Sequence, residues 1–411
     1  MLRSLRVQGY KSLQDVTVKF PRMAVLFGPN AAGKSNLLDA IQALSRIGTE
    51  RTLADALDDP IRGYPIEAFS FPRDGLAALL SGPSAEFRLA ADLTRTKDAY
   101  RYRVGVEIAP GSGALGVTEE YLTLLAQDGT PKGTPAIELV EGELRVRRRG
   151  ERGRPNNEPL RQNYTVLSDP RRSRPLHPAI EDVRSELSDW RTYYLDPRVA
   201  MRSAQPPSDV RDIGVLGGDI APFLFRLQAE HEKHFAAVRR TLRSLVPSVD
   251  DLTVDLDRRR GTLDILVRQG GVDYSSRIVS EGTLRVLALC AIAVNPWGGS
   301  LLAFEEPENG VHPRRLELIA QLLLSLALEQ GRQVVVTTHS PLFCDAVLRS
   351  ARERPDDTGL FSVRRAGAAT VVQQFDATGP LFEDREVAAA LTAGTEDGLF
   401  ESLMLRGMLD E

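Results

Sequence analysis

The sequence predicts an α/β protein with a mixed sheet core and a separate antiparallel β patch. Residues 24–27 form a continuous apolar run followed by a glycine-rich loop and a helical pattern, as expected of a buried parallel strand that leads into a helix. Residues 301–304 and 334–336 are two more continuous apolar runs. In contrast, residues 86–93 and 99–108 alternate apolar and polar side chains, which indicates half-buried antiparallel strands.

The composition is that of a globular chain with a substantial core. The chain has 411 residues, of which 42% are hydrophobic and 26% are charged. We expect a cytoplasmic protein without membrane contact, because the sequence has neither an N-terminal apolar signal segment nor about 18 consecutive apolar residues. Cys290 and Cys344 lie in apolar stretches far apart. They predict buried thiols and argue against a zinc site or a disulfide.

Charge is unevenly distributed, although the net charge is only −4. Ten arginines occur from Arg145 to Arg174, at positions 145, 147, 148, 149, 152, 154, 161, 171, 172 and 174. From Asp376 onward, nine acidic residues stand against two arginines. Because residues 147–175 lack hydrophobic periodicity, we expect a mobile arginine-rich loop there, and an acidic helical end to the chain. The arginine-rich loop either contacts DNA phosphates or is only a solvated loop.

Three segments follow from these patterns. Residues 1–145 are expected to hold an opening hairpin, the first half of the core and the antiparallel patch. Residues 146–250 contain the arginine-rich loop and then an inserted helical lobe. In residues 251–411, helices and apolar strands alternate before a β-hairpin at 360–375 and the acidic end. No heptad repeat is sustained, so we expect no long coiled coil.

Residues 28–35 match the phosphate-binding pattern GxxxxGK[ST]. The matching residues are Gly28, Pro29, Asn30, Ala31, Ala32, Gly33, Lys34 and Ser35, and Asn36 follows them in the helix. In this pattern backbone N–H groups surround the phosphates, the lysine neutralises the β/γ oxygens, and the serine hydroxyl ligates Mg²⁺. The sequence therefore predicts a MgATP site in which Lys34 acts on the phosphates and Ser35 on the metal. An ordinary glycine turn is the alternative.

Polar groups follow both of the later apolar strands. Glu305 is expected to enter the Mg²⁺ sphere, and Glu306 to orient and deprotonate the attacking water. His339 comes directly after the strand 333–338, at the edge where ligands bind in open α/β sheets. A neutral imidazole there can hydrogen-bond a γ-phosphate or the attacking water. Structural carboxylates and a core histidine are the alternatives, and the phosphate loop upstream disfavours them.

The order of these motifs resembles the RecF/SMC-like branch of ABC-type ATPases. The resemblance is carried by the phosphate loop, then Ser280-Glu281-Gly282-Thr283-Leu284-Arg285, Glu305-Glu306-Pro307-Glu308-Asn309-Gly310-Val311-His312-Pro313 and Thr337-Thr338-His339-Ser340-Pro341. Within this branch the chain is most similar to the AAA ATPases of the overcoming-lysogenization-defect (OLD) type and to their relatives in abortive-infection and Septu-like phage defence. The resemblance implies a P-loop NTPase fold of the ABC-ATPase type.

The resemblance also implies further site residues and a dimer. Ser280 and Gly282 belong to a signature motif that binds the γ-phosphate held by the opposite protomer, so that two copies of the chain sandwich ATP. Asn309 lies in the D-loop, and His339 is the switch histidine. Lys11 is similar to a basic residue that reaches toward nucleotide. By its own pattern, Ser280 is equally a helix N-cap.

Departures from the family pattern narrow the range of activities. Glu305 stands where the general pattern has Asp, no glutamine for a Q-loop occurs from 43 to 126, and the residues after His339 lack the carboxylates of a TOPRIM nuclease. A self-sufficient nuclease is therefore disfavoured, and so is a transporter subunit, which would carry an LSGGQ-like signature. We expect an ATP-driven dimerising switch in phage defence that acts with a separate nuclease or toxin effector. The alternative is a RecF-like DNA-repair ATPase.

Overall fold

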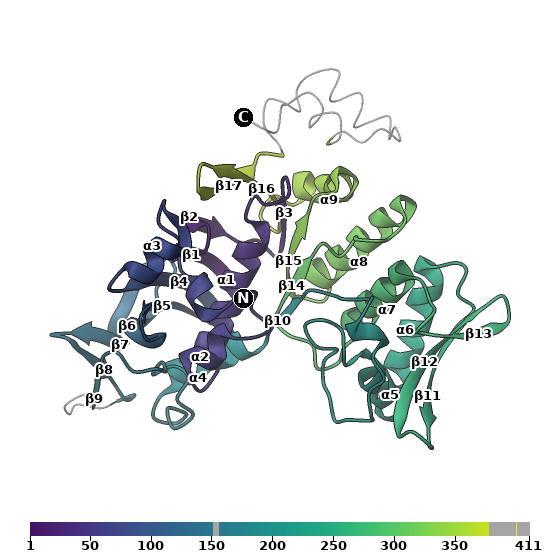
Figure 1. Ribbon diagram of the computed structural model, residues 1–411, viewed down its shortest axis with the longest axis horizontal. Helices are drawn as coiled ribbons and strands as arrows, with labels where there is room; N and C mark the ends of the chain where they lie inside the picture. The colour runs from purple at the N-terminus through teal and green to yellow at the C-terminus, as the bar shows by residue number, and fades with distance from the viewer. Residues whose placement is uncertain (151–155, 378–399, 401–411) are drawn as a thin grey trace. The chain divides into compact units, whose positions relative to one another are not determined.

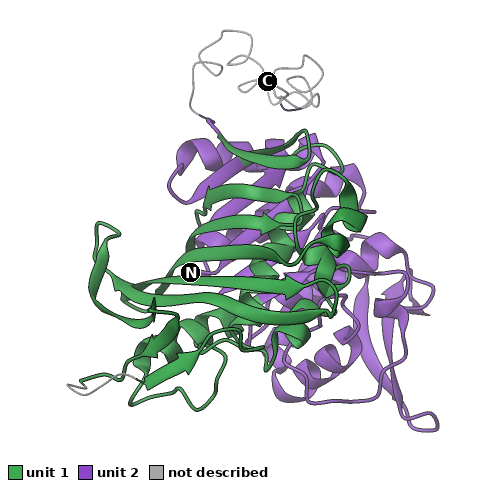
Figure 2. Cartoon of the chain, turned by 60° about the vertical axis from the view of Figure 1, so that its left-hand side comes forward, with its two compact units in different colours: residues 1–21, 28–190, 361–374 green, residues 22–27, 191–360, 375–411 purple. Residues whose placement is uncertain are grey.

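The computed structural model describes residues 1–150, 156–377 and 400, and the chain divides into two compact units (Figure 1 and Figure 2). Unit 1 contains residues 1–21, 28–190 and 361–374, and unit 2 contains residues 22–27, 191–360 and 375–411. These units do not follow the segment boundaries expected at 145/146 and 250/251. The acidic end predicted from Asp376 onward falls almost entirely outside the described residues.

An eight-stranded sheet forms the centre of unit 1, with strand order β2-β1-β4-β5-β6-β7-β8-β9. Its strands are β1 (Leu2–Tyr10), β2 (Leu13–Lys19), β4 (Ala85–Arg95), β5 (Asp98–Ala109), β6 (Ala114–Leu125), β7 (Pro131–Val140), β8 (Glu143–Val146) and β9 (Asn156–Pro159). All neighbouring pairs are antiparallel. On β5, Tyr102 and Val104 are buried while Arg103 between them is exposed. The alternation read from the sequence thus correctly predicts the antiparallel patch and the opening hairpin.

Helices pack on this sheet through their apolar sides. The helical elements of unit 1 are α1 (Lys34–Ile47), α2 (Leu53–Leu57), η1 (Pro65–Ala68), α3 (Gly75–Ser81) and α4 (Pro178–Ser188). Helix α4 contacts β4, β5 and β6, α1 contacts β1, and α2 contacts β6. The predicted hairpin near the end of the chain is also present, as β16 (Thr358–Ala366) and β17 (Ala369–Phe375). Most of its residues belong to unit 1.

A parallel sheet forms the core of unit 2. Strands β10 (Trp190–Tyr193), β14 (Leu301–Glu305), β15 (Gln333–Thr338) and β3 (Met23–Phe27) lie in that order. The pairs β14–β15 and β15–β3 are parallel, and every residue of β3 and β15 is buried. Continuous apolar runs are what strands covered on both faces require, so these runs correctly predict the core strands.

Helices and a small sheet complete unit 2. These elements are η2 (Ala200–Arg202), α5 (Ile220–Glu230), α6 (Glu232–Leu245), β11 (Asp251–Asp257), β12 (Thr262–Gln269), β13 (Val272–Ser275), α7 (Glu281–Ala293), η3 (Pro313–Arg315), α8 (Leu316–Leu328) and α9 (Pro341–Glu353). Helix α8 packs on β3 and β15, while α5 and α6 pack on α7 and β11. Cys290 and Cys344 are both buried, as predicted. Among the described residues, no helix is long and apolar enough to cross a membrane.

A buried carboxylate ties the sheet of unit 1 to the segment that follows β9. Glu120 on β6 is fully buried and accepts hydrogen bonds from the backbone N–H groups of Val166 at 2.7 Å and Leu167 at 2.9 Å. The Tyr102 hydroxyl also donates to it, at 3.1 Å. Burial raises the pKa of Glu120 from 4.5 to about 7, against the lowering effect of these donors.

This raised pKa predicts how the stability of unit 1 depends on pH. Between about pH 4.5 and 7 the folded chain holds a proton on Glu120 that the unfolded chain has released, so stability falls as pH rises, by at most roughly 1.4 kcal/mol per pH unit. Glu120→Gln cannot titrate and should flatten that slope. We expect a smaller change of the thermal midpoint between pH 5 and 7 than in native protein or in the control Glu119→Gln. An unchanged slope in Glu120→Gln would contradict this origin.

Candidate functional site

Two positions of the phosphate-binding loop have a backbone conformation that only glycine adopts without strain. The loop begins at Gly28, directly after β3, where φ is 147°, and it ends at Gly33, the N-cap of α1, where φ is 105°. A Cβ on Gly28 would lie 2.1 Å from the Val363 carbonyl oxygen, and one on Gly33 would lie 2.0 Å from Thr370 Oγ1. Both positions combine a left-handed backbone with a close approach by β16 or β17. The GxxxxG spacing thus has a conformational cause.

Lys34 opens α1 and is directed back at the loop. Its side chain is 5% exposed, and its ammonium donates to the carbonyl oxygens of Gly28 at 2.8 Å and Pro29 at 2.9 Å. The first N–H groups of α1 have no partner within the helix, and the helix dipole is positive at this end. The loop, the helix start and the lysine together form a site suited to phosphate groups.

The hairpin β16–β17 supports the loop through polar contacts that the sequence analysis missed. Thr370 Oγ1 donates to the Ala32 carbonyl oxygen at 2.9 Å and lies 2.7 Å from Ser12 Oγ. Asn36 Nδ2 in turn donates to Ser12 Oγ at 2.7 Å. Arg365 reaches the Ala31 carbonyl oxygen at 3.3 Å. More than 330 residues separate Ala32 from Thr370, so no local pattern signals this support.

Lys11 forms a buried ion pair. Its ammonium lies 2.6 Å from Asp39 Oδ2 and donates to the Arg62 carbonyl oxygen at 2.9 Å. Asp39 is fully buried on α1, and the Arg62 guanidinium reaches the same oxygen at 3.1 Å. The structure therefore places Lys11 beside the helix that begins at the phosphate loop. Its role toward nucleotide stays a prediction.

Three strands of unit 2 end side by side at one edge of the parallel sheet. Glu305 at the end of β14 is paired in register with Thr337, and Thr338 at the end of β15 with Phe27 at the end of β3. The residues that follow these ends are Glu306, His339 and Gly28. In parallel sheets this carboxyl edge is where ligands bind. The sheet thus brings the predicted carboxylates and the predicted histidine to one edge.

Glu306 is the centre of a cluster of polar side chains. His339 Nδ1 lies 3.2 Å from Glu306 Oε1, and Asn309 Nδ2 donates to Glu306 Oε2 at 3.1 Å. The Glu306 side chain is 25% exposed, so water can reach it. Its backbone is left-handed, with φ of 43°, and its N–H donates to the Thr337 carbonyl oxygen at 3.0 Å. Such backbone strain in a residue that is not glycine is concentrated at functional sites.

Ser280 and Gly282 lie at the start of α7. Ser280 is exposed, and its Oγ accepts from the Thr283 N–H at 3.2 Å, so it is an N-cap as its pattern predicts. Gly282 lies against the segment that contains Asn309, because a Cβ on Gly282 would come within 2.4 Å of the Gly310 carbonyl oxygen. The start of α7 and this segment are thus packed backbone to backbone.

Two side chains predicted to act on Mg²⁺ offer oxygen donors of a suitable kind. Mg²⁺ keeps several waters and takes one or two protein oxygens together with substrate phosphates. The Ser35 hydroxyl in the first turn of α1 and the Glu305 carboxylate at the end of β14 are oxygen donors of this kind. The described residues contain no group of three or more His, Cys, Asp or Glu side chains placed to hold a metal.

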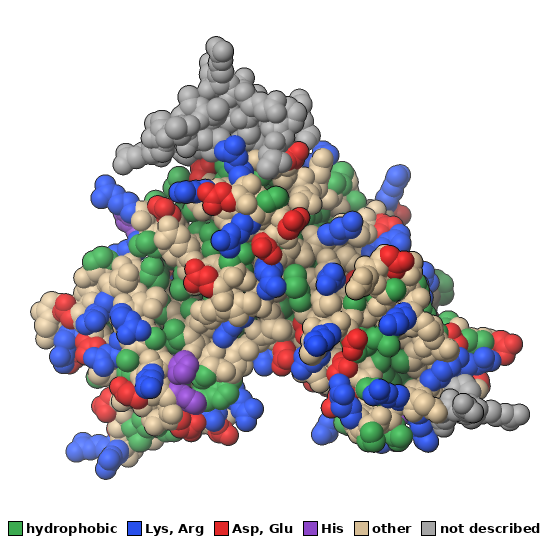
Figure 3. All heavy atoms as spheres, turned by 180° about the vertical axis from the view of Figure 1, so that it is seen from behind, with side chains coloured by type: hydrophobic (Ala, Val, Ile, Leu, Met, Phe, Trp, Pro, Cys, Tyr) green, Lys and Arg blue, Asp and Glu red, His purple; other side chains and the backbone are tan. Residues whose placement is uncertain are grey.

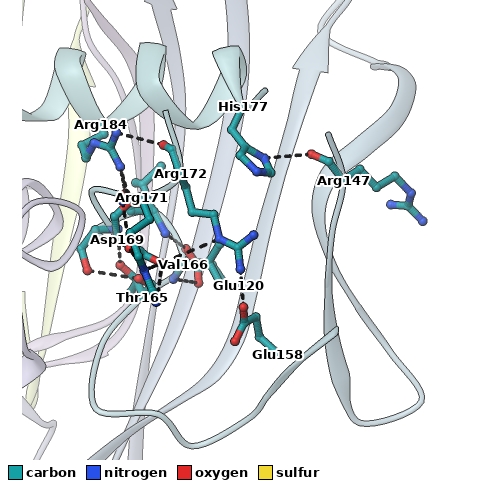
Figure 4. Close-up of polar contacts among 12 residues, drawn as sticks. Glu120, Arg147, Glu158, Thr165, Val166, Asp169, Arg171, Arg172, His177 and Arg184 are labelled. Carbon is teal, nitrogen blue, oxygen red and sulfur yellow. Dashed lines mark hydrogen bonds and ion pairs between the residues drawn. The ribbon is translucent and has the colours of Figure 1, made fainter. Parts of the chain in front are cut away.

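The arginine-rich segment is more ordered in its contacts than its composition suggests. Of its eight described arginines, six form ion pairs with carboxylates, namely Arg145–Glu141, Arg147–Glu138, Arg161–Glu107, Arg171–Asp169, Arg172–Glu158 and Arg174–Asp182. Figure 4 shows Arg172 between Glu158 and Asp169, and Arg184 donating to backbone carbonyls of the segment. Strand β9 also lies within it. The described residues of the segment are largely irregular in structure, as expected of a loop, but most of their arginines are engaged in ion pairs. Arg152 and Arg154 lie outside the described residues.

Comparison with known proteins gives a family match and two similar folds. Residues 23–345 match the family described as "AAA domain, putative AbiEii toxin, Type IV TA system". The fold is similar to that of an SMC head domain bound to the C-terminal winged-helix domain of ScpA (13% identity, TM-score 0.50, covering 93% of this chain and 99% of the other). It is also similar to an SMC head with an extended coiled coil bound to the C-terminal domain of ScpA, derived from Pyrococcus furiosus (13% identity, TM-score 0.51, covering 95% and 99%). No curated protein matches the sequence.

These findings confirm the predicted fold class, a P-loop fold of the ABC-ATPase type. The matched range 23–345 contains all the candidate site residues except Lys11. The chain belongs to the AAA family whose description names the AbiEii toxin, a family of P-loop ATPases.

Proposed function

We propose that the chain hydrolyses MgATP, with Glu306 as the general base. The observation that supports this most strongly is the cluster in which His339 and Asn309 each hold one oxygen of the Glu306 carboxylate. A carboxylate fixed in this way, and still open to water, can accept a proton from an attacking water molecule. A carboxylate with a purely structural role at the end of a strand would not need two such contacts together with access to water.

The phosphate loop supplies the binding part of this reaction. Lys34 already directs its ammonium at loop carbonyls, and phosphate oxygens would replace these acceptors when nucleotide binds. Ser35 and Glu305 would hold Mg²⁺, which neutralises charge that develops on the phosphates. Release of phosphate from MgATP by the purified chain tests the proposal. Turnover no faster than that of Lys34→Ala would contradict it.

We further propose that two copies of the chain close over ATP and act as a switch. Ser280 supports this proposal because it is exposed at the N-terminus of α7, where a helix end can receive a phosphate from a second copy. The similar SMC heads are each bound to a domain of ScpA, and by analogy a separate protein is proposed to read the state of this switch. A nuclease or toxin effector fits that role.

The biological setting proposed is phage defence by abortive infection. The family description names a toxin of a type IV toxin–antitoxin system, which favours defence over the alternative, a RecF-like repair ATPase. The reading frames beside the gene distinguish the two. A neighbouring nuclease, protease or toxin supports defence, and neighbouring replication or recombination genes support repair.

Contact with DNA is a further proposal, and the structure narrows the residues that would make it. A cavity of about 600 Å³ is lined by Arg147, Arg148, Arg149 and Arg174 together with Asp98 and Asp182. Arg148 and Arg149 are exposed, and Arg149 forms no ion pair with a described residue. Figure 3 shows blue and red side chains interspersed on the face it draws. The proposed DNA contact depends on the local positive charge of these arginines.

Replacing an exposed arginine tests this contact. Arg149→Ser should weaken duplex DNA binding and reduce the slope of log Kd against log salt by about 1, because one phosphate contact is lost. The matched control is Arg161→Ser, whose guanidinium is paired with Glu107. Equal effects of the two variants, or no ATP-dependent DNA binding by the native chain at low salt, would refute the proposal.

A further inference from the structure

Arg285 is a half-buried charge whose Nε atom has no partner among the described residues. It lies in the second turn of α7, and its Nε is fully buried without a hydrogen bond. Among the described residues it forms no ion pair within 4 Å. Burial lowers the pKa of Arg285, and the nearby carboxylates of Glu308, Glu281 and Glu306 oppose that shift. A guanidinium in this state is costly, because buried charges are normally paired and hydrogen-bonded.

Within the described part of the chain, Glu308 has a buried carboxylate oxygen without a hydrogen-bond donor, and Arg285 has a buried donor without an acceptor. The Glu308 side chain is buried, Thr338 Oγ1 donates to its Oε1, and its Oε2 has no hydrogen-bond donor among the described residues. Burial also raises the pKa of Glu308. Thr338 directly precedes His339, and Glu308 follows Glu306 by two residues. Glu308 is therefore linked to the cluster around the proposed base in two ways, through the hydrogen bond from Thr338 and through the chain from 306 to 308.

The unpaired atoms of Arg285 and Glu308 belong to two segments that meet in a tight backbone contact. The start of α7 meets the segment 306–310 at Gly282 and Gly310, where a Cβ would approach a carbonyl oxygen to 2.4 Å. Because no side chain separates these backbones, a small shift of α7 along the segment is sterically simple. Such a shift would move Arg285 relative to Glu308 while the Glu306 cluster stays on its strand ends.

We propose that Arg285 and Glu308 are positioning residues which pair directly when α7 engages ATP held by a second copy of the chain. This proposal rests on the proposed ATP-driven switch. The pairing would satisfy Glu308 Oε2 and the Arg285 guanidinium together. Through Thr338 and the chain from 306 to 308, it would hold Glu306 and His339 in the geometry that hydrolysis requires. The second copy would thereby control the base through α7.

A set of four proteins tests this coupling: native, Arg285→Met, Glu308→Gln and the double variant. Each single change should lower kcat about 10-fold and leave KM for ATP within about twofold, because the residues position the base and do not touch nucleotide. The double variant should be no slower than the slower single variant, since both changes break one interaction. Arg285→Lys should recover part of the rate. Losses that multiply in the double variant, or a change in KM alone, would overturn the proposal.

A second measurement needs no turnover. Without nucleotide, Arg285→Met should be at least as stable as native protein, because it removes a half-buried charge whose enclosed Nε has no hydrogen bond to a described residue. With MgATP, the rise of the thermal midpoint should be reduced in both single variants and no further in the double variant. A destabilised Arg285→Met with an unreduced MgATP effect would mean a purely structural arginine. If the native chain lacks turnover but shows this coupled midpoint effect, the proposed hydrolysis is wrong and the pairing stands.

Discussion

Glu306→Gln is expected to bind MgATP as the native chain does and to hydrolyse it roughly 10²- to 10⁴-fold more slowly. The amide has nearly the shape of the carboxylate, so the packing at the end of β14 should persist. It cannot accept the proton of the attacking water, and this loss is confined to the chemical step. Lys34→Ala should instead abolish binding, because it removes the main positive charge on the β/γ-phosphates.

Binding and turnover therefore have to be measured separately on the same proteins. Equilibrium binding of a fluorescent ATP analogue reports the first, and phosphate release reports the second. Glu317→Gln is the matched control, because Glu317 is an exposed carboxylate of α8 in the same unit. It should be native in both assays. Equal loss of binding in Glu306→Gln and Lys34→Ala would exclude Glu306 as the base.

The core strands and the motif positions could be predicted from the sequence because their causes are local. Runs such as 333–338 must be buried on both faces, and the GxxxxGK[ST] spacing requires left-handed positions at Gly28 and Gly33. The strand-end location of Glu305 and His339 follows from parallel pairing alone. Where one short pattern determines the backbone, the sequence is enough to place the residue.

The arginine-rich segment shows where this reasoning fails. Its composition predicted a mobile loop, but several of its arginines are paired with carboxylates elsewhere in the chain, such as Glu107 on β5 and Asp182 on α4. Ion pairs of this kind depend on which strands and helices become neighbours in the fold. A count of charges along the chain does not contain that information, so these ion pairs were missed.

The contacts that support the phosphate-binding loop from distant parts of the chain could not be predicted from the sequence either. Thr370 and Ser12 hold the loop at Ala32 and Asn36 from opposite ends of the chain. The left-handed backbone of Glu306 is also a product of the fold, because nothing in a Glu-Glu-Pro sequence requires it. Arg285 and Glu308 were visible only as parts of motifs. Their unpaired buried atoms became apparent from the structure.

The second prediction with a large expected effect concerns an active site that two copies of the chain share. If the Ser280 of one copy completes the site at Lys34 of the other, then Lys34→Ala and Ser280→Arg should each be inactive as homodimers. The first cannot hold the phosphates. The second places a bulky charged side chain where the γ-phosphate must dock. Ser280→Arg alone should still bind ATP, because its own phosphate loop is intact.

In a mixed dimer, the intact Lys34 of one chain faces the intact Ser280 of the other, so one of the two sites is restored. Equal mixing makes about half of the dimers mixed, and independent sites then give about a quarter of native activity. The control mixes Lys34→Ala with a Lys34→Ala/Ser280→Arg double variant. This population has no intact Lys34 and should stay inactive.

The measurement that tests the account most directly is phosphate release after the two inactive variants have exchanged subunits. The ATP-sandwich account predicts recovery to about a quarter of the native rate, or less if the two sites act cooperatively, and none in the control. Failure to recover any activity after verified subunit exchange would contradict the account, and so would full activity of Ser280→Arg alone.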